Sequence, residues 1–290
     1  MARLKGVPKS LIYRILRKGE VRVNKGRVKP DYKLQPGDVV RVPPVRVAQK
    51  VDLMRPSDSL ATFLKDNTLY EDDYLFIVNK PSGLAVHGGS GVSLGLIESL
   101  RQIRDERFLE LVHRLDRGTS GCVMVAKSRR GLLYMQQQLR DGDIDKVYRA
   151  LVVGRWPNRR RQVKVSLLKS QLSSGERIVR AVEQETSGAK ASLTEYRVLN
   201  RYAESTLVEA KPVTGRTHQI RVHSQYTGHP ILGDDKYSNR EQLAHAREIG
   251  LKRLFLHAFS LNFKTLDRKT VFVEAPLGDD LQNVLDNLGG

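Results

Sequence analysis

The stretch Leu111-Val112-His113-Arg114-Leu115-Asp116-Arg117-Gly118-Thr119-Ser120-Gly121 decides how this chain is interpreted. Short apolar, β-prone runs at 108–112 and 122–126 flank it, which predicts two strands joined by a loop. The loop carries a single carboxylate, Asp116, between Arg114 and Arg117. Gly118 and Gly121 allow backbone conformations that are closed to other residues. A loop held by two strands in this way can present Asp116 as a nucleophile or a base.

The loop also has a purely structural explanation, because an aspartate near glycine often only stabilises a turn. From the residues alone both explanations stay open. The run His-Arg-Leu-Asp-x-x-Thr-Ser-Gly at 113–121, however, resembles the signature of the RluA-type pseudouridine synthases. In that family the aspartate is the catalytic residue, so the resemblance implies that Asp116 is catalytic.

The composition is that of a folded and strongly basic protein. The 290 residues are 40% hydrophobic and 28% charged, and 50 Lys and Arg against 32 Asp and Glu give a net charge of +18. No window has the roughly 18 apolar residues of a membrane span, and the first residues lack the apolar core of a secretory signal. The lone cysteine, Cys122, rules out an intramolecular disulfide, which fits a reducing cytoplasm.

Positive charge is concentrated at the N-terminal end. Residues 1–50 contain 14 Lys and Arg against 3 Asp and Glu, a net charge of +11, which leaves +7 for the other 240 residues. This asymmetry favours an appended module that binds a polyanion, although a solvated basic surface would have the same composition. Apolar spacing predicts a helix over 9–18, ended by glycine, and alternation at 21–23 and 39–42 predicts strands.

Two pieces of this region resemble the S4 RNA-binding domain, namely residues 12–21 and the run Pro36-Gly37-Asp38-Val39-Val40. We therefore expect Arg14, Arg17 and Lys18, which lie off the apolar face of the predicted helix, to contact RNA. S4 domains usually begin with a further helix, and this chain starts about where that helix should end. We therefore expect an N-terminally shortened module.

Two later segments extend the resemblance to the synthase family. The predicted strand at 145–154 contains Tyr148, the catalytic tyrosine by resemblance, which taken alone would more often be an ordinary aromatic residue of a sheet. The run Gly215-Arg216-Thr217-His218-Gln219-Ile220-Arg221-Val222-His223 resembles a third signature. A helix is predicted over 217–227, and by resemblance Arg221 is the ion-pair partner of Asp116.

The segment Asn79-Lys80-Pro81-Ser82-Gly83 resembles the first motif of the family. Ordinary loop polarity explains its lysine and the nearby His87 equally well. The sequence assigns no chemical role to Lys80, His87 or His218.

The resemblance implies a reaction that breaks the bond between uracil N1 and ribose C1′ and rejoins the base through C5. A carboxylate near an anomeric carbon can attack it or stabilise positive charge there, and an arginine in a dry site keeps that carboxylate ionised. Tyr148 is then the candidate acceptor or relay for the C5 proton. The uridine must first leave its stack, and by resemblance Arg114 fills the gap. No cofactor is needed, and none has a motif.

Other motifs favour other functions less strongly. Gly91-Val92-Ser93-Leu94-Gly95 matches the nucleophile elbow of serine hydrolases, but that elbow needs a strand directly before it, where this chain has a glycine-rich loop. His218 and His223, five residues apart, lie on different helix faces, so we predict no metal site. A non-catalytic RNA-binding protein remains the rival, with Asp116 as a turn residue.

These observations predict an α+β fold with a mixed, mostly antiparallel sheet. We expect an S4-like module over 1–50, a linker over 51–68 and a pseudouridine synthase domain over 69–290. By resemblance the partner is 23S ribosomal RNA, and the same chemistry on another RNA such as tRNA is the alternative. We expect a cytoplasmic monomer that makes no membrane contact.

Overall fold

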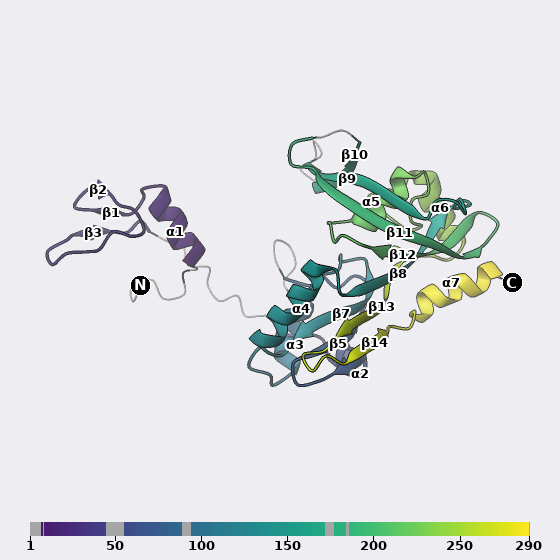
Figure 1. The fold of residues 1–290 in the computed structure, drawn as a ribbon, viewed down its shortest axis with the longest axis horizontal. Coiled ribbons are helices and arrows are strands. Elements are labelled where there is room, and N and C mark those ends of the chain that lie inside the picture. The colour runs from purple at the N-terminus through teal and green to yellow at the C-terminus, as the bar shows by residue number, and fades with distance from the viewer. Residues whose placement is uncertain are drawn as a thin grey trace. The chain divides into compact units, whose positions relative to one another are not determined.

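A computed structural model of the chain describes residues 7, 9–44, 55–88, 94–171, 177–183 and 186–289. The chain divides into two compact units, residues 1–53 and 54–290. Figure 1 shows the helices and strands of each unit.

The first unit is a helix followed by a small antiparallel sheet of strand order β2-β1-β3. Its elements are α1 (Lys9–Arg17), β1 (Arg22–Val23), β2 (Gly26–Arg27) and β3 (Val40–Arg41). Its buried apolar side chains are few, with Ile15, Val21 and Val23 at the centre. Asp38 joins the two turns by accepting hydrogen bonds from the Asn24 side chain at 2.6 Å and the Gln35 N–H at 2.9 Å. The predicted helix and strands are confirmed.

The second unit is built on one large sheet. Among the described residues this sheet has eleven strands. Nine of them follow the order β10-β9-β11-β12-β8-β13-β7-β5-β4, while β14 pairs with β13 and β6 pairs with β7. The β13–β7 pair is parallel and the other pairs are antiparallel, so the predicted mixed, mostly antiparallel sheet is confirmed. The strands are β4 (Thr68–Glu71), β5 (Leu75–Lys80), β6 (Glu110–Leu111), β7 (Ser120–Ala126), β8 (Asp145–Val153), β9 (Gln162–Gln171), β10 (Arg177–Val182), β11 (Lys190–Arg201), β12 (Ser205–Pro212), β13 (Leu256–Lys264) and β14 (Thr270–Glu274).

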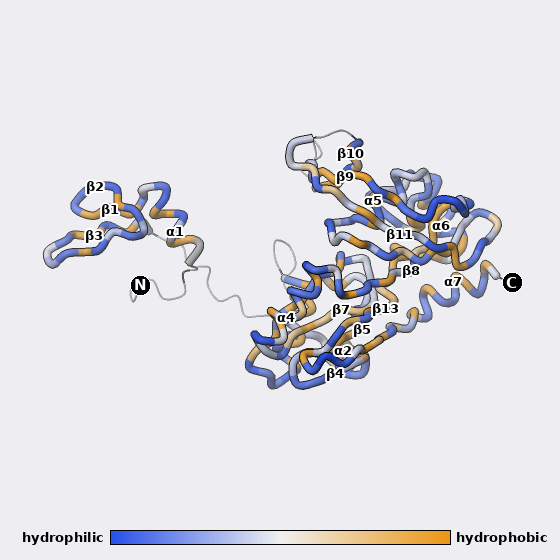
Figure 2. Tube along the Cα trace, viewed as in Figure 1, coloured by the Kyte–Doolittle hydropathy of each residue, from blue (hydrophilic) through white to orange (hydrophobic). Residues whose placement is uncertain are grey.

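Six helices accompany this sheet in the described part of the second unit. They are α2 (Asp58–Asp66), α3 (Leu96–Ile103), α4 (Arg129–Asp141), α5 (Gln219–Tyr226), α6 (Arg240–Glu248) and α7 (Asp279–Gly289). Around β5 and β7 both faces of the sheet are buried. Phe76 and Val78 pack with Ile97 and Leu100 of α3 on one face, and Ile77 packs with α4 on the other. Burial on both faces explains why these strands are continuously apolar, as Figure 2 shows along β7.

The other half of the sheet has a core of its own, formed by β8, β9, β11 and β12 with α5, α6 and α7. Trp156, which is fully buried, packs against Tyr196 with ring centroids 4.4 Å apart. Tyr148 on β8 contacts both this core and the one beside α3. The place where the two cores meet is therefore occupied by a residue that the sequence singled out.

The structure differs from the sequence-based expectations in two places. Part of the range expected to be a linker is helix α2, which begins with Ser57 accepting a hydrogen bond from the Leu60 N–H and buries Leu64. Its many polar residues hide a single apolar contact face, which is why composition indicated a linker. The sequence of residues 155–194 predicts short strands alternating with polar turns, whereas the structure has the ten-residue strand β9 and the twelve-residue strand β11, which begins at Lys190.

No helix of the part of the chain that the structure describes is both long enough and apolar enough to cross a bilayer.

Replacing Gly121 tests how closely β7 must approach β13. Gly121 has φ +108, and a Cβ there would lie 2.2 Å from the Ala258 carbonyl oxygen. Gly142, with φ +83, has no atom within 4 Å of such a Cβ. Both alanine variants should lose about 1–2 kcal/mol because of the positive φ, and Gly121→Ala should lose a further ~1–3 kcal/mol from overpacking. Equal losses in urea unfolding would contradict the close approach.

Candidate active site

Asp116 lies on the loop between β6 and β7, and the turn after β5 holds this loop from behind. The Gly83 N–H donates to the Arg117 carbonyl and Arg117 Nε donates to the Gly83 carbonyl, both at 2.9 Å. The Ser82 hydroxyl donates to the Gly118 carbonyl at 2.8 Å. Because these bonds hold the two residues after Asp116, its carboxylate has a defined position.

Lys80 adds a buried connection between the same two segments. Its side chain is fully buried, and its Nζ donates to the carbonyls of Pro81 at 2.9 Å, Leu84 at 2.8 Å and Arg117 at 3.3 Å. Burial lowers the pKa of Lys80 to about 7. The three carbonyl acceptors nevertheless match the three hydrogens of an ammonium group, so the hydrogen bonds favour the protonated form. Lys80, to which the sequence assigned no role, thus supports the loop of Asp116.

The far end of the loop is anchored by a buried polar chain. His257 Nε2 lies 3.0 Å from the Ala275 carbonyl, which can only accept, so Nδ1 accepts from the Ser120 hydroxyl at 2.8 Å. Burial lowers the pKa of His257 to about 4, which keeps the ring neutral. Arg253 donates to Ser120 at 3.1 Å and pairs with Asp280. The loop is therefore linked to β13 and to helix α7.

Arg221 on α5 faces the carboxylate, but its tightest partner is another residue. Its side chain is 6% exposed, and Nε and Nη2 donate to the two oxygens of buried Asp234 at 2.7 and 2.6 Å. Its remaining nitrogen, Nη1, lies 3.6 Å from Asp116 Oδ2. Burial opposes the charge of Arg221, but its hydrogen bonds to Asp234 and the negative charge of that carboxylate raise the pKa of Arg221 above the ordinary value. The expected pairing with Asp116 is present, and Asp234 fixes its direction.

His218 is the second neighbour of Asp116. It precedes α5 with φ 53, and its Nε2 lies 3.8 Å from Asp116 Oδ2. Its Nδ1 lies 2.7 Å from the Tyr237 hydroxyl, which also accepts from the Val179 N–H. Burial raises the pKa of Tyr237 to about 12 and lowers the pKa of His218. A neutral phenol that donates to Nδ1 leaves the hydrogen on Nε2, facing Asp116.

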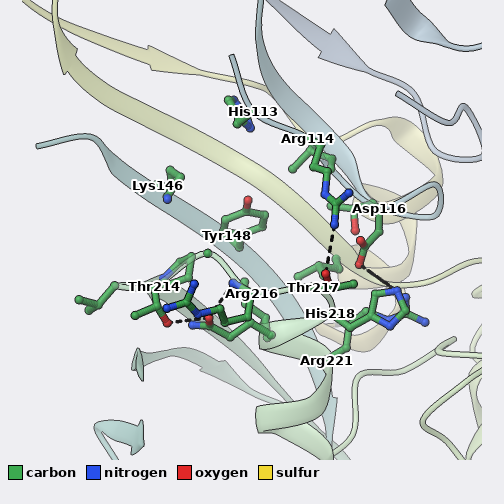
Figure 3. Close-up of a pocket in the computed structure, with 18 of the residues that line it drawn as sticks. His113, Arg114, Asp116, Lys146, Tyr148, Thr214, Arg216, Thr217, His218 and Arg221 are labelled. Atoms are coloured by element: carbon green, nitrogen blue, oxygen red, sulfur yellow. Dashed lines mark hydrogen bonds and ion pairs between the residues drawn. The ribbon is translucent and has the colours of Figure 1, made fainter. Parts of the chain in front are cut away.

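Asp116, Tyr148 and Arg221 line one cavity of about 580 Å³, a size typical of ligand sites. Figure 3 shows Tyr148 beside the loop that carries Thr214 and Arg216. Burial, with a contribution from the charge of Asp116, raises the pKa of Tyr148 above its usual value. The phenol is therefore neutral near pH 7.

Arg114 lies at the mouth of the same cavity. Its Nη2 donates to the Thr217 hydroxyl at 3.1 Å, and Figure 3 shows this bond joining the Asp116 loop to the segment before α5. The guanidinium is exposed, so it can meet a ligand that enters the cavity.

Several residues singled out from the sequence lie elsewhere. Arg14 and Arg17 on α1 and Lys18 directly after it are exposed in the first unit. His87 has a side chain that is 54% exposed, with Nδ1 3.8 Å from Glu98, and it does not line the cavity. Ser93 of the elbow-like motif lies outside the described residues. Within the described ranges no group of three or more His, Cys, Asp or Glu side chains could hold a metal ion.

Sequence reasoning missed Asp234 and Tyr237, and it found no role for His218. Asp234 follows the run Pro230-Ile231-Leu232-Gly233, and its partner Arg221 lies 13 positions earlier on a helix. No spacing rule connects Asp234 with Arg221. The segment 229–233, in which Ile231 forms a β-bridge with Val152 of β8, brings the two side chains together only in the folded chain. The one available signal was Arg221 itself, since a buried arginine needs a carboxylate.

The comparisons with known proteins agree with this geometry. Residues 74–226 match the family model described as RNA pseudouridylate synthase, and residues 1–40 match the S4 domain. The chain belongs to the RNA pseudouridylate synthase family. It is 55% identical to a protein of Haemophilus influenzae named ribosomal large subunit pseudouridine synthase C, over 99% of this chain and 89% of that protein. The protein of the same name from Pasteurella multocida is also 55% identical, over 99% and 88%.

A solved structure of a human relative supports the same family assignment. The structure, titled Human RNA Pseudouridylate Synthase Domain Containing 4, matches with a TM-score of 0.66 and 27% identity, over 80% of this chain and 96% of that one. The fold expected from the sequence is thereby confirmed as the pseudouridine synthase fold with an S4 domain. As a family member the chain is a pseudouridine synthase, which removes the rival interpretation as a non-catalytic binding protein.

Arg221→Lys keeps the positive charge of the side chain but removes the guanidinium geometry that binds two carboxylate oxygens at once. A lysine cannot bind both oxygens of Asp234 and also face Asp116, so we expect a loss of about 1–3 kcal/mol in unfolding free energy and about 10²-fold in turnover. Arg197→Lys is the matched control, because Arg197 makes the same two-bond pair with Glu209 at the surface. It should change stability by less than about 0.5 kcal/mol. A wild-type turnover rate for Arg221→Lys would contradict the assigned geometry.

Proposed function

We propose that this synthase converts uridines of 23S ribosomal RNA to pseudouridine, with Asp116 acting at ribose C1′. The observation that carries the proposal is the position of Asp116. Its carboxylate is 29% exposed inside a cavity and lies 3.6 Å from a guanidinium that a second carboxylate holds in place. The names of the relatives, which are similar over nearly the whole chain, support the choice of RNA.

The reaction requires a group that acts on the sugar while the base is detached. Asp116 either attacks C1′ or stabilises positive charge there as the bond to N1 breaks and its electron pair stays with uracil. Arg221 Nη1, 3.6 Å from Asp116 Oδ2, faces the carboxylate before the attack. Rotation of the base then brings C5 to C1′, where the new bond forms and restores the free carboxylate.

The hydrogen on C5 must finally leave as a proton. Because burial raises the pKa of Tyr148, a phenolate is scarce near pH 7, and Tyr148 suits a relay better than a permanent base. In that role it accepts the C5 proton as its own hydrogen passes to another acceptor. Arg114 at the cavity mouth is placed to occupy the position that the extruded uridine leaves in the RNA.

The first unit is proposed to contribute RNA affinity. Its exposed Arg14, Arg17 and Lys18 form a cationic surface at the C-terminal end of α1. Phosphate contacts of this kind position an RNA without reading its sequence. We propose an RNA-binding module over 1–50 and a catalytic domain over 69–290; within the range 51–68 between them, helix α2 packs on the catalytic unit.

Asp116→Asn keeps the shape of the side chain and removes its charge. Turnover should vanish while RNA binding remains, because Asn cannot act as a nucleophile at C1′. The assay is release of tritium from C5 of uridine in 23S ribosomal RNA, with transfer RNA tested in parallel. Asp267→Asn, at an exposed position, is the control and should keep full activity. Residual product from Asp116→Asn would refute the nucleophile role, and release from transfer RNA alone would reassign the substrate.

Replacing Arg14, Arg17 and Lys18 together by Gln tests the first unit. If each contacts a phosphate, the slope of log affinity against log salt should fall by about 2–3, from roughly 0.7–0.9 per contact. Turnover at saturating RNA should change little. The control is the triple variant Arg129, Lys252 and Lys269 to Gln, which removes the same charge from exposed positions of the second unit. A salt slope equal to that of the wild type would show that α1 does not contact the RNA.

A further inference from the structure

Lys146 is a cavity residue that the mechanism above does not use. It lies on β8 two residues before Tyr148, and both side chains line the cavity, as expected for positions i and i+2 of a strand. Two residues along a strand span about 7 Å. Figure 3 shows Lys146 on the side of Tyr148 away from Asp116 and Arg221.

The ammonium of Lys146 has no partner in the part of the chain that the structure describes. The side chain is half-buried, and burial lowers its pKa. The Lys146 side chain makes no hydrogen bond or ion pair with the described residues. The adjacent carboxylate, Asp145, points to the other face of the sheet and pairs with Lys211 at 2.6 Å.

The groups that face Lys146 provide no negative charge. The nearby His113 accepts a hydrogen bond from the Met124 N–H through Nε2 at 3.1 Å, and burial lowers its pKa to about 4, so it is neutral. Tyr148 is also neutral because its pKa is raised. Arg140, the other charged residue at this end, is a cation on the last turn of α4 and is bound to Gln137. A half-buried cation without an anion is unfavourable unless a ligand supplies one.

The whole cavity has the charge pattern of a polyanion site. Among its described lining residues five are Lys or Arg and the single carboxylate is Asp116. Arg216, another lining residue, donates from Nε to the Ala191 carbonyl at 3.3 Å and makes no ion pair with a carboxylate of the described residues. In the proposed function Asp116 and Arg221 act at the ribose. The cations at the other end of the cavity are therefore available to bind another part of the RNA.

We propose that Lys146 binds a backbone phosphate of a nucleotide next to the extruded uridine, with Arg140 at the rim of the same site. This inference rests on the proposed function and names a contact that sets the register of the RNA in the cavity. A phosphate contact of this kind positions the substrate and carries no base preference.

The test measures RNA binding in the Asp116→Asn background, which prevents turnover, with a fragment of 23S ribosomal RNA at several salt concentrations. Lys146→Met should weaken binding at low salt by about tenfold and lower the salt slope by roughly 0.7–0.9, the value of one phosphate contact. Lys146→Arg keeps a cation and should keep the slope. Lys269→Met, which removes one exposed charge outside the cavity, should leave both quantities unchanged.

In otherwise wild-type enzyme, Lys146→Met should raise KM with a small effect on kcat. A salt slope unchanged by Lys146→Met, or lowered equally by Lys146→Arg, overturns the phosphate assignment. A large fall in kcat with an unchanged slope overturns it as well and assigns Lys146 to the chemical step. Failure of the proposed function is distinct, because it appears as no tritium release by the wild-type enzyme from an RNA that it binds.

Discussion

The buried pair of Arg221 and Asp234 is the interaction on which the site depends. Two nitrogens of the guanidinium are bound by a carboxylate with no exposure to solvent, and only the third points at Asp116. Removal of one partner from such a pair costs about 3–5 kcal/mol, because the other charge is left buried alone. The same arrangement lets a half-exposed carboxylate meet a cation whose direction is set before the substrate arrives, which is what preorganisation requires.

The loop of Asp116 is held by contacts from both of its ends. Lys80 and Ser82 bind its carbonyls from the turn after β5, while His257 and Arg253 bind Ser120 where β7 begins. These residues do not touch the reacting atoms and act by positioning the loop. Helix α7 takes part through Asp280, so the last element of the chain supports a loop formed more than 150 residues earlier.

Charge is distributed unevenly along the cavity. At the Asp116 end a guanidinium and a neutral imidazole each lie within 4 Å of the carboxylate. At the Lys146 end the described residues provide cations without anions. A polyanion can therefore be bound by one part of the cavity while the other part acts on its sugar, with the neutral Tyr148 between them.

The sequence by itself determined the family, the α+β class and most helices and strands of the sheet core, and it singled out Asp116, Tyr148 and Arg221, which line one cavity in the structure. Local patterns sufficed there, because an alternating strand, a capped helix and a long signature are all short-range features. Only the tertiary structure decided that Asp234 orients Arg221, that Lys80 supports the loop and that Lys146 is unpaired. These facts depend on contacts between segments far apart in the chain. The packing of the folded chain, and not sequence spacing, determines which groups hydrogen-bond to a buried charge.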